Sequence, residues 1–145
     1  MNATELYERD FFEWTQCNAS LLRAGRFDQA DIEHIAEEIE DMGKSERRAL
    51  ESHLIVLLIH LLKWQIQSEH QSVSWRGTIK IQRKDIVKLL GEMPSLMRLL
   101  KDNLAEAYED AVLKASAETG LPQRHFPSSC PFTLEQILDQ EFFPE

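Results

Sequence analysis

Two histidines near the middle of the chain, His53 and His60, have a spacing that could place two imidazoles beside a metal ion. They are seven residues apart, so a helix presents both on one stripe. Glu38 and Glu40 could add carboxylates, because helical bundles bind metals through Glu and His from facing helices. The Glu-x-x-His pattern of di-iron bundles is missing. No cofactor is expected, and a divalent metal at these four residues is an alternative to a hydrogen-bonded core histidine at position 60.

The other histidines and the two cysteines form no catalytic set. His34 lies well away from the apolar face of its predicted helix, so we expect it to be solvated. Cys17 falls on an apolar helical stripe, which is a poor place for a reactive thiolate. His125 and Cys130 lie near each other in the chain, but no third member completes a triad. These patterns favour a protein that is not an enzyme.

A row of basic residues marks one face of a predicted helix. Arg76, Lys80 and Arg83 follow the spacing i, i+4, i+7, and Lys84 lies beside them. Such a face could hold phosphate groups or a nucleic-acid backbone, with Trp75 as a stacking surface. An acidic protein partner would fit the same residues.

Charge is segregated along the chain. The net charge is −9 overall, and it divides into −8 over residues 1–43, +5 over 44–88 and −6 over 89–145. An acidic protein is not expected to bind nucleic acids generally, so only the local contact described above remains open.

Large aromatic side chains are numerous for a chain of 145 residues. Trp64 and Trp75 are candidates for an aromatic pocket or an interface, because exposed aromatic patches mark interaction surfaces. Packing in the core is the alternative for both. Phe142 and Phe143, in the closing sequence EFFPE, indicate that the segment 121–145 docks on the helices.

Hydrophobic periodicity predicts an all-α fold, a compact bundle of about five helices plus a short C-terminal helix, in a single domain over residues 1–145. Five Gly and five Pro leave little material for the turns of a sheet protein. The apolar run 54–62 is far shorter than the about 20 residues of a membrane span, so it predicts a buried central helix and no membrane segment. The expected helices cover residues 5–24, 29–42, 45–67, 75–90 and 96–118, with a last short helix from Thr133. Asp28, Gly25, Gly43 and Gly120 are the expected start and stop residues.

Several segments, in order, resemble a known bacterial family. They are YERDFFEW, EEIEDMG, LLIHLLKWQ, SWRGTIKIQR, PSL, YEDA and CPFTLEQILDQEFFPE. Together they are similar to the family named domain of unknown function 29 over nearly the whole chain. The resemblance implies an all-helical domain without an established activity, and it supplies no catalytic residue.

The leading functional hypothesis is a non-enzymatic cytoplasmic module that binds a protein partner or a second copy of itself. It is based on the segregated charge and on the absence of a complete catalytic set. The alternatives are a metal site near His53 and His60, and a phosphate or nucleic-acid contact through the basic row.

Overall fold

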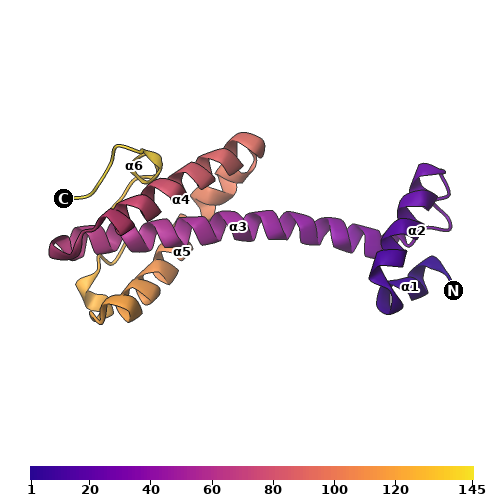
Figure 1. The fold of residues 1–145 in the computed structure, drawn as a ribbon, viewed down its shortest axis with the longest axis horizontal. Helices are drawn as coiled ribbons and strands as arrows, with labels where there is room; N and C mark the ends of the chain where they lie inside the picture. The colour runs from indigo at the N-terminus through magenta and orange to yellow at the C-terminus, as the bar shows by residue number, and fades with distance from the viewer. The chain divides into compact units, whose positions relative to one another are not determined.

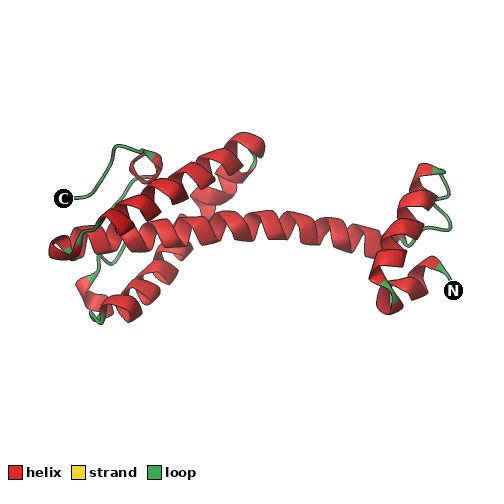
Figure 2. Ribbon diagram, viewed as in Figure 1, coloured by secondary structure: helices red, strands yellow, loops and turns green.

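The computed structural model describes residues 1–145, and every regular element in it is a helix (Figure 2). The all-α prediction with a long central helix is therefore confirmed. In chain order the elements are α1 (Ala3–Arg9), α2 (Phe11–Arg23), α3 (Ile32–Ile66), η1 (Ser68–His70), α4 (Val73–Glu92), α5 (Leu96–Thr119), η2 (Gln123–His125) and α6 (Leu134–Leu138) (Figure 1).

Packing divides the chain into two compact units, Met1–Glu46 and Arg47–Glu145. The first unit contains α1, α2 and the beginning of α3, and the second contains the remainder of α3 and all later elements. The single domain expected over residues 1–145 stays a prediction.

Helix α3 is longer than expected, because Gly43 does not end a helix. Separate helices over 29–42 and 45–67 were wrong, since one helix runs without interruption from Ile32 to Ile66. A glycine stops a helix when it takes the left-handed conformation, as Gly25 (φ 72°) and Gly120 (φ 76°) do here. Gly43 is helical, and good helix formers on both sides carry the helix through it. The start is also shifted, from the expected cap at Asp28 to Asp31 directly before α3.

Replacing Gly43 with Ala should stabilise the protein. A methyl group at this position meets no atom within 4 Å, and alanine is favoured over glycine inside a helix by about 1 kcal/mol. Chemical denaturation should therefore give a free energy of unfolding higher by about 0.5–1 kcal/mol. Gly25→Ala is the matched control and should lower it by about 1–2 kcal/mol, because its φ is positive. Equal effects of the two substitutions would contradict the assignment.

The first predicted helix, 5–24, is divided in the structure at Asp10. This residue leaves the helical conformation (φ −153°, ψ 88°), and its carboxylate accepts a hydrogen bond of 3.0 Å from the Glu13 N–H. It thereby ends α1 and caps α2. Asn2 caps α1 through a reciprocal bond with Glu5.

The core of the second unit surrounds the C-terminal part of α3. Leu57, Leu58, Leu61 and Leu62 have no exposed surface. The side chains that pack around them come from α4, α5, α6 and the segment between α5 and α6: Ile79, Ile86, Leu100, Ala107, Ala111, Ala115, Phe126, Phe132 and Ile137. The small alanines of α5 permit close helix approach, and the C-terminal segment packs on the core through Phe132 and Ile137.

Helix α3 also has the length and composition of a membrane-crossing helix. Its most apolar 18-residue window has a mean hydropathy of 1.3, and 44% of that window is buried in the protein. Core helices pass the same test, so this property gives no membrane assignment.

Candidate functional site

A polar network in the first unit centres on Asp31, a carboxylate with only 6% of its surface exposed. The Trp14 indole N–H donates to Asp31 Oδ2 at 3.0 Å, and the Asp31 N–H donates to Asn18 Oδ1 at 2.8 Å. His34 Nδ1 donates to the same Oδ2 at 2.7 Å. Asn18 is also buried and donates to the Trp14 carbonyl oxygen at 2.9 Å. The network joins α2 to the start of α3.

The contacts of His34 change its titration. It was expected to be solvated, but it lies partly buried against Asp31 and stacks on the Tyr7 ring at 3.8 Å between ring centroids. The hydrogen bond to Asp31 raises the pKa of His34, against the effect of burial, and the charges of Asp31, Glu37 and Glu8 add to it. Burial raises the pKa of Asp31, but the bonds from Trp14 and His34 outweigh it and hold that pKa below its usual value.

The stability of the first unit should depend on pH through the His34–Asp31 pair. The stability that His34 contributes is complete below the ordinary histidine pKa of 6.5. It is lost as the pH rises through the raised pKa of His34 in the folded protein. The stability that Asp31 contributes is present above the ordinary aspartate pKa of 3.8. It is lost as the pH falls through the lowered pKa of Asp31 in the folded protein. The difference in melting temperature between wild type and His34→Gln should therefore be largest at about pH 5–6 and shrink by about pH 8.5.

The exposed His70 beside Glu69 provides the control for that experiment. His70→Gln should leave the melting temperature nearly unchanged across the same pH range. A His34→Gln effect that is constant with pH would contradict the assigned pairing.

Tyr7 extends the network to the next turn of α3. Its hydroxyl donates to Glu38 Oε1 at 2.5 Å, and this bond, together with burial and the charge of Glu38, raises the pKa of Tyr7 to about 12. Glu38 is therefore used in holding α1 to α3. His34 Nε2 has no hydrogen bond to the protein, and no hydroxyl or thiol is bonded to it. The cluster can hold a proton on His34.

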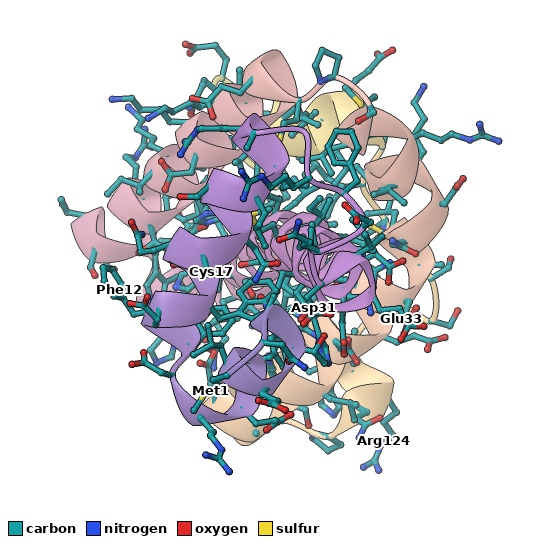
Figure 3. The ribbon with its side chains drawn as sticks, turned by 90° about the vertical axis from the view of Figure 1, so that its right-hand side faces the viewer. Met1, Phe12, Cys17, Asp31, Glu33 and Arg124 are labelled. Carbon is teal, nitrogen blue, oxygen red and sulfur yellow. The ribbon has the colours of Figure 1, made fainter.

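The first unit buries few apolar side chains and exposes many. Only Ala3 and Trp14 are buried hydrophobic residues in it. Phe12 projects from α2 with 72% of its surface exposed (Figure 3). Eight large hydrophobic residues are exposed here: Met1, Phe11, Phe12, Leu22, Phe27, Ile32, Ile39 and Met42.

Part of this exposed surface forms a groove of about 200 Å³ between α2 and α3. We call it the α2–α3 groove. Its walls are almost entirely apolar, apart from Thr15, Asn18 and Glu38: Trp14, Thr15, Asn18, Ala19, Leu22, Ile35, Glu38, Ile39 and Met42. Ile39 is 58% exposed and Met42 is 62% exposed along it.

The predicted metal residues belong to different units. Glu38 and Glu40 lie in the first unit, and His53 and His60 lie in the second. His60 Nδ1 donates to the Val56 carbonyl at 2.8 Å, and His53 Nδ1 lies 2.6 Å from Gln82 Oε1. No group of three or more His, Cys, Asp or Glu is arranged to hold a metal ion. The metal site stays a prediction.

The predicted basic row is divided by the packing of α4. Arg76, Lys80 and Lys84 are exposed, whereas Arg83 is completely buried. Arg83 Nε donates to the Ile137 carbonyl at 2.7 Å, and Nη2 donates to the Gln136 carbonyl at 3.2 Å. Its Nη1 has no partner. Burial lowers the pKa of Arg83, against the charge of Asp139. Arg83 is therefore a structural residue that holds α6, and the exposed row continues instead to Lys88.

The two tryptophans of the second unit are covered to different extents. Trp64 is buried, and the Phe143 ring packs on it at 4.9 Å. The Arg76 guanidinium lies 4.6 Å from the Phe143 ring centre. Trp75 is half-buried, with Lys63 Nζ 5.2 Å from its ring. The C-terminal segment therefore fills the space that an aromatic pocket around Trp64 would offer.

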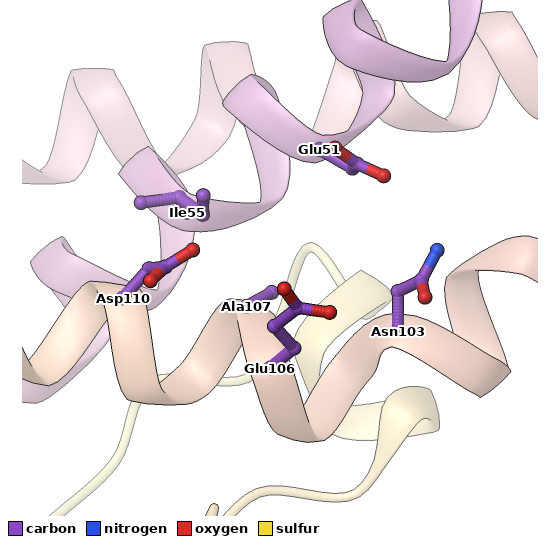
Figure 4. Close-up of a pocket in the computed structure, with 6 residues that line it drawn as sticks. All are labelled: Glu51, Ile55, Asn103, Glu106, Ala107 and Asp110. Atoms are coloured by element: carbon purple, nitrogen blue, oxygen red, sulfur yellow. The ribbon is translucent and has the colours of Figure 1, made fainter.

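Two cavities of the second unit border α5. A small one of about 70 Å³ lies between Glu51 and Ile55 of α3 and four residues of α5: Asn103, Glu106, Ala107 and Asp110 (Figure 4). A larger one of about 560 Å³ lies between α5 and the segment 123–128. Beside it Tyr108 donates to the Pro127 carbonyl at 2.6 Å, and burial raises the pKa of Tyr108 to about 12. Burial also raises the pKa of the Cys130 thiol, which keeps it protonated.

Comparison with known proteins places the chain in a family. The family model described as Domain of unknown function DUF29 matches residues 6–143. The chain belongs to the DUF29 family. No curated protein and no solved structure matches this DUF29 chain.

The Asp31 network of this DUF29 chain was not predicted. Trp14 and Asp31 are 17 residues apart, and no sequence motif connects an indole to a carboxylate at that distance. The one available signal was an aspartate directly before an apolar helical run, which is typical of a helix cap. The α2–α3 groove was missed as well, because Ile39 and Met42 carry the spacing of a buried face.

Proposed function

We propose that this DUF29 chain is a non-enzymatic protein-interaction module of the cytoplasm, which binds a basic amphipathic helix in its α2–α3 groove. The observation that supports the proposal most directly is the exposed apolar surface of the first unit. Eight of the twelve large hydrophobic residues that the protein exposes lie within its first 46 residues. A concentration of this kind is typical of interaction surfaces.

The stability of the first unit points in the same direction. A unit of this size buries a small fraction of its surface, and with two buried apolar residues it has a minimal core. A helix laid on Ile39 and Met42 would bury their side chains and extend that core. Partner helices bind in this manner by placing residues with spacing i, i+3 or i+4, and i+7 into an apolar groove.

The negative charge of the first unit determines which kind of helix the α2–α3 groove favours. Residues 1–46 carry 12 acidic and 4 basic side chains, a net charge of −8. Glu46 is exposed on α3 one turn beyond Met42, and Glu38 lines the groove itself. An acidic border around an apolar groove favours a helix with basic residues beside its apolar ones, and it disfavours an acidic helix.

The test uses two synthetic amphipathic peptides, one of Leu and Lys and one of Leu and Glu in the same pattern. Titration calorimetry with the full chain should show binding of the Leu–Lys peptide and at least about tenfold weaker binding of the Leu–Glu peptide. Ile39→Asp and Met42→Asp should each weaken Leu–Lys binding by about tenfold or more.

The matched control is Leu113→Asp on α5, because Leu113 is 52% exposed and lies outside the first unit. Its affinity should equal that of the wild type. Equal binding of both peptides, or unchanged binding by Ile39→Asp, would overturn the proposal.

The exposed row of Arg76, Lys80 and Lys84 favours a second candidate, a phosphate or nucleic-acid contact. It predicts retention on single-stranded DNA that falls steeply as salt is raised. Retention that is absent or independent of salt would exclude it.

A further inference from the structure

We infer that the basic helix is α4 of a second copy of this chain, which docks in the α2–α3 groove of the first copy. This inference rests on the proposed function, because it names the occupant of the same groove. The chain would then associate with itself through two different surfaces, the first unit of one copy and α4 of another.

The outer face of α4 has the chemistry that the groove requires. Lys80, Lys84 and Lys88 are exposed on it, whereas the Arg76 guanidinium lies 4.6 Å from the Phe143 ring centre. Exposed apolar residues lie among them: Val73 is 89% exposed, Ile81 is 59% exposed and Val87 is 50% exposed. Helical periodicity places Val73, Ile81, Lys84 and Lys88 on the side of α4 opposite the buried Ile79 and Ile86, with Lys80 and Val87 at its edge. The outer face is therefore both basic and apolar.

The first unit and α4 together hold eleven of the twelve large hydrophobic residues that the protein exposes. Of the twelve exposed large hydrophobic residues, eight lie in the first unit and three on α4, and Leu113 is the only other. A contact between the groove and α4 would cover Leu22, Ile39 and Met42, which line the groove, together with exposed apolar residues of α4.

Charge favours this pairing over the two symmetric ones. Two first units in contact would bring two surfaces of net charge −8 together. Two α4 helices in contact would oppose their rows of exposed basic residues. Only the contact of a first unit with α4 joins opposite charges, and like charges across an interface are unfavourable.

The oligomeric state of the full chain tests the inference. Sedimentation equilibrium from about 1 to about 100 µM should show association, which weakens when NaCl is raised from about 50 to about 500 mM. A chain that remains monomeric at about 100 µM and low salt would overturn the inference.

A charge exchange distinguishes this contact from other ways to associate. Glu46→Lys makes one variant, and Lys80→Glu with Lys84→Glu makes the other. All three positions are exposed, so both variants should fold. Each variant alone should associate about tenfold or more weakly than wild type. An equal mixture should regain association, because each groove then meets an α4 of opposite charge.

Failure of the inference differs from failure of the proposed function. Association without recovery in the mixture would exclude the α4 contact. A strictly monomeric wild type that binds the Leu–Lys peptide would exclude the second copy but support a basic helix from another protein. A wild type that neither associates nor binds the peptide would exclude both.

Discussion

Arg83→Ala should lower the free energy of unfolding by about 3–5 kcal/mol and release the C-terminal segment from the second unit. The guanidinium is completely buried and donates to the carbonyls of Ile137 and Gln136. Its removal leaves two carbonyl oxygens without their donor and opens a cavity beside Phe143, whose ring centre lies 5.5 Å from the guanidinium carbon. Urea denaturation measures the loss, and limited proteolysis after residue 120 should reveal the released segment.

Two variants separate the role of Arg83 from a general effect on α4. Lys88→Ala removes the same charge from an exposed position on the same helix and should change the stability by less than about 0.5 kcal/mol. Arg83→Met keeps most of the volume and removes the charge together with its unpartnered Nη1, so it should cost less than Arg83→Ala. If Arg83→Ala were as mild as Lys88→Ala, the buried guanidinium would have no anchoring role.

Trp14→Ala should unfold the first unit. The substitution removes one of its two buried apolar side chains and the indole N–H that donates to Asp31. A Trp-to-Ala change in a core lowers the free energy of unfolding by about 3–5 kcal/mol, which is as much as a core this small provides. Far-ultraviolet circular dichroism should lose the helical signal of α1 and α2. Hydrogen exchange should show lost protection before Ile32 and unchanged protection in α4 and α5.

Trp14→Phe is the matched control, because it keeps the aromatic ring and removes only the hydrogen bond. It should cost about 1–3 kcal/mol and leave α1 and α2 folded. A Trp14→Ala variant with full protection in α2 would show that this side chain does not hold the unit together.

Periodic apolar residues predicted the helical class of nearly every segment, because helical periodicity is local in the sequence. The ends at Gly25 and Gly120 followed from glycines that take positive φ. The helix end predicted at Gly43 was wrong, because the sequence alone does not say whether a glycine ends a helix or lies within it. Similarly, Asp10 has the residue type of a cap, yet it lies within an apolar stripe that continues on both sides.

The candidate sites were harder to predict, because burial of a charged residue depends on distant partners. Arg83 has the same helical spacing as Arg76 and Lys80. It is nevertheless buried, because it donates hydrogen bonds to the carbonyls of Gln136 and Ile137, which are 53 and 54 residues later in the chain. His34 has its partner three residues away, and Asp31 itself is held by Trp14 and Asn18 on α2. Of the predicted basic row, Arg76, Lys80 and Lys84 are exposed, whereas Arg83 is buried.

The separation between Arg83 and its carbonyl partners also sets an order of events on the ribosome. Synthesis proceeds from the N-terminus, so the first unit and α4 leave the ribosome well before Gln136 and Ile137 are made. Until then the Arg83 charge can only remain hydrated, which keeps the adjacent Ile79 and Ile86 from closing into a dry core. Nascent chains halted before residue 136 should accordingly contain a second unit that chaperones for unfolded proteins still recognise.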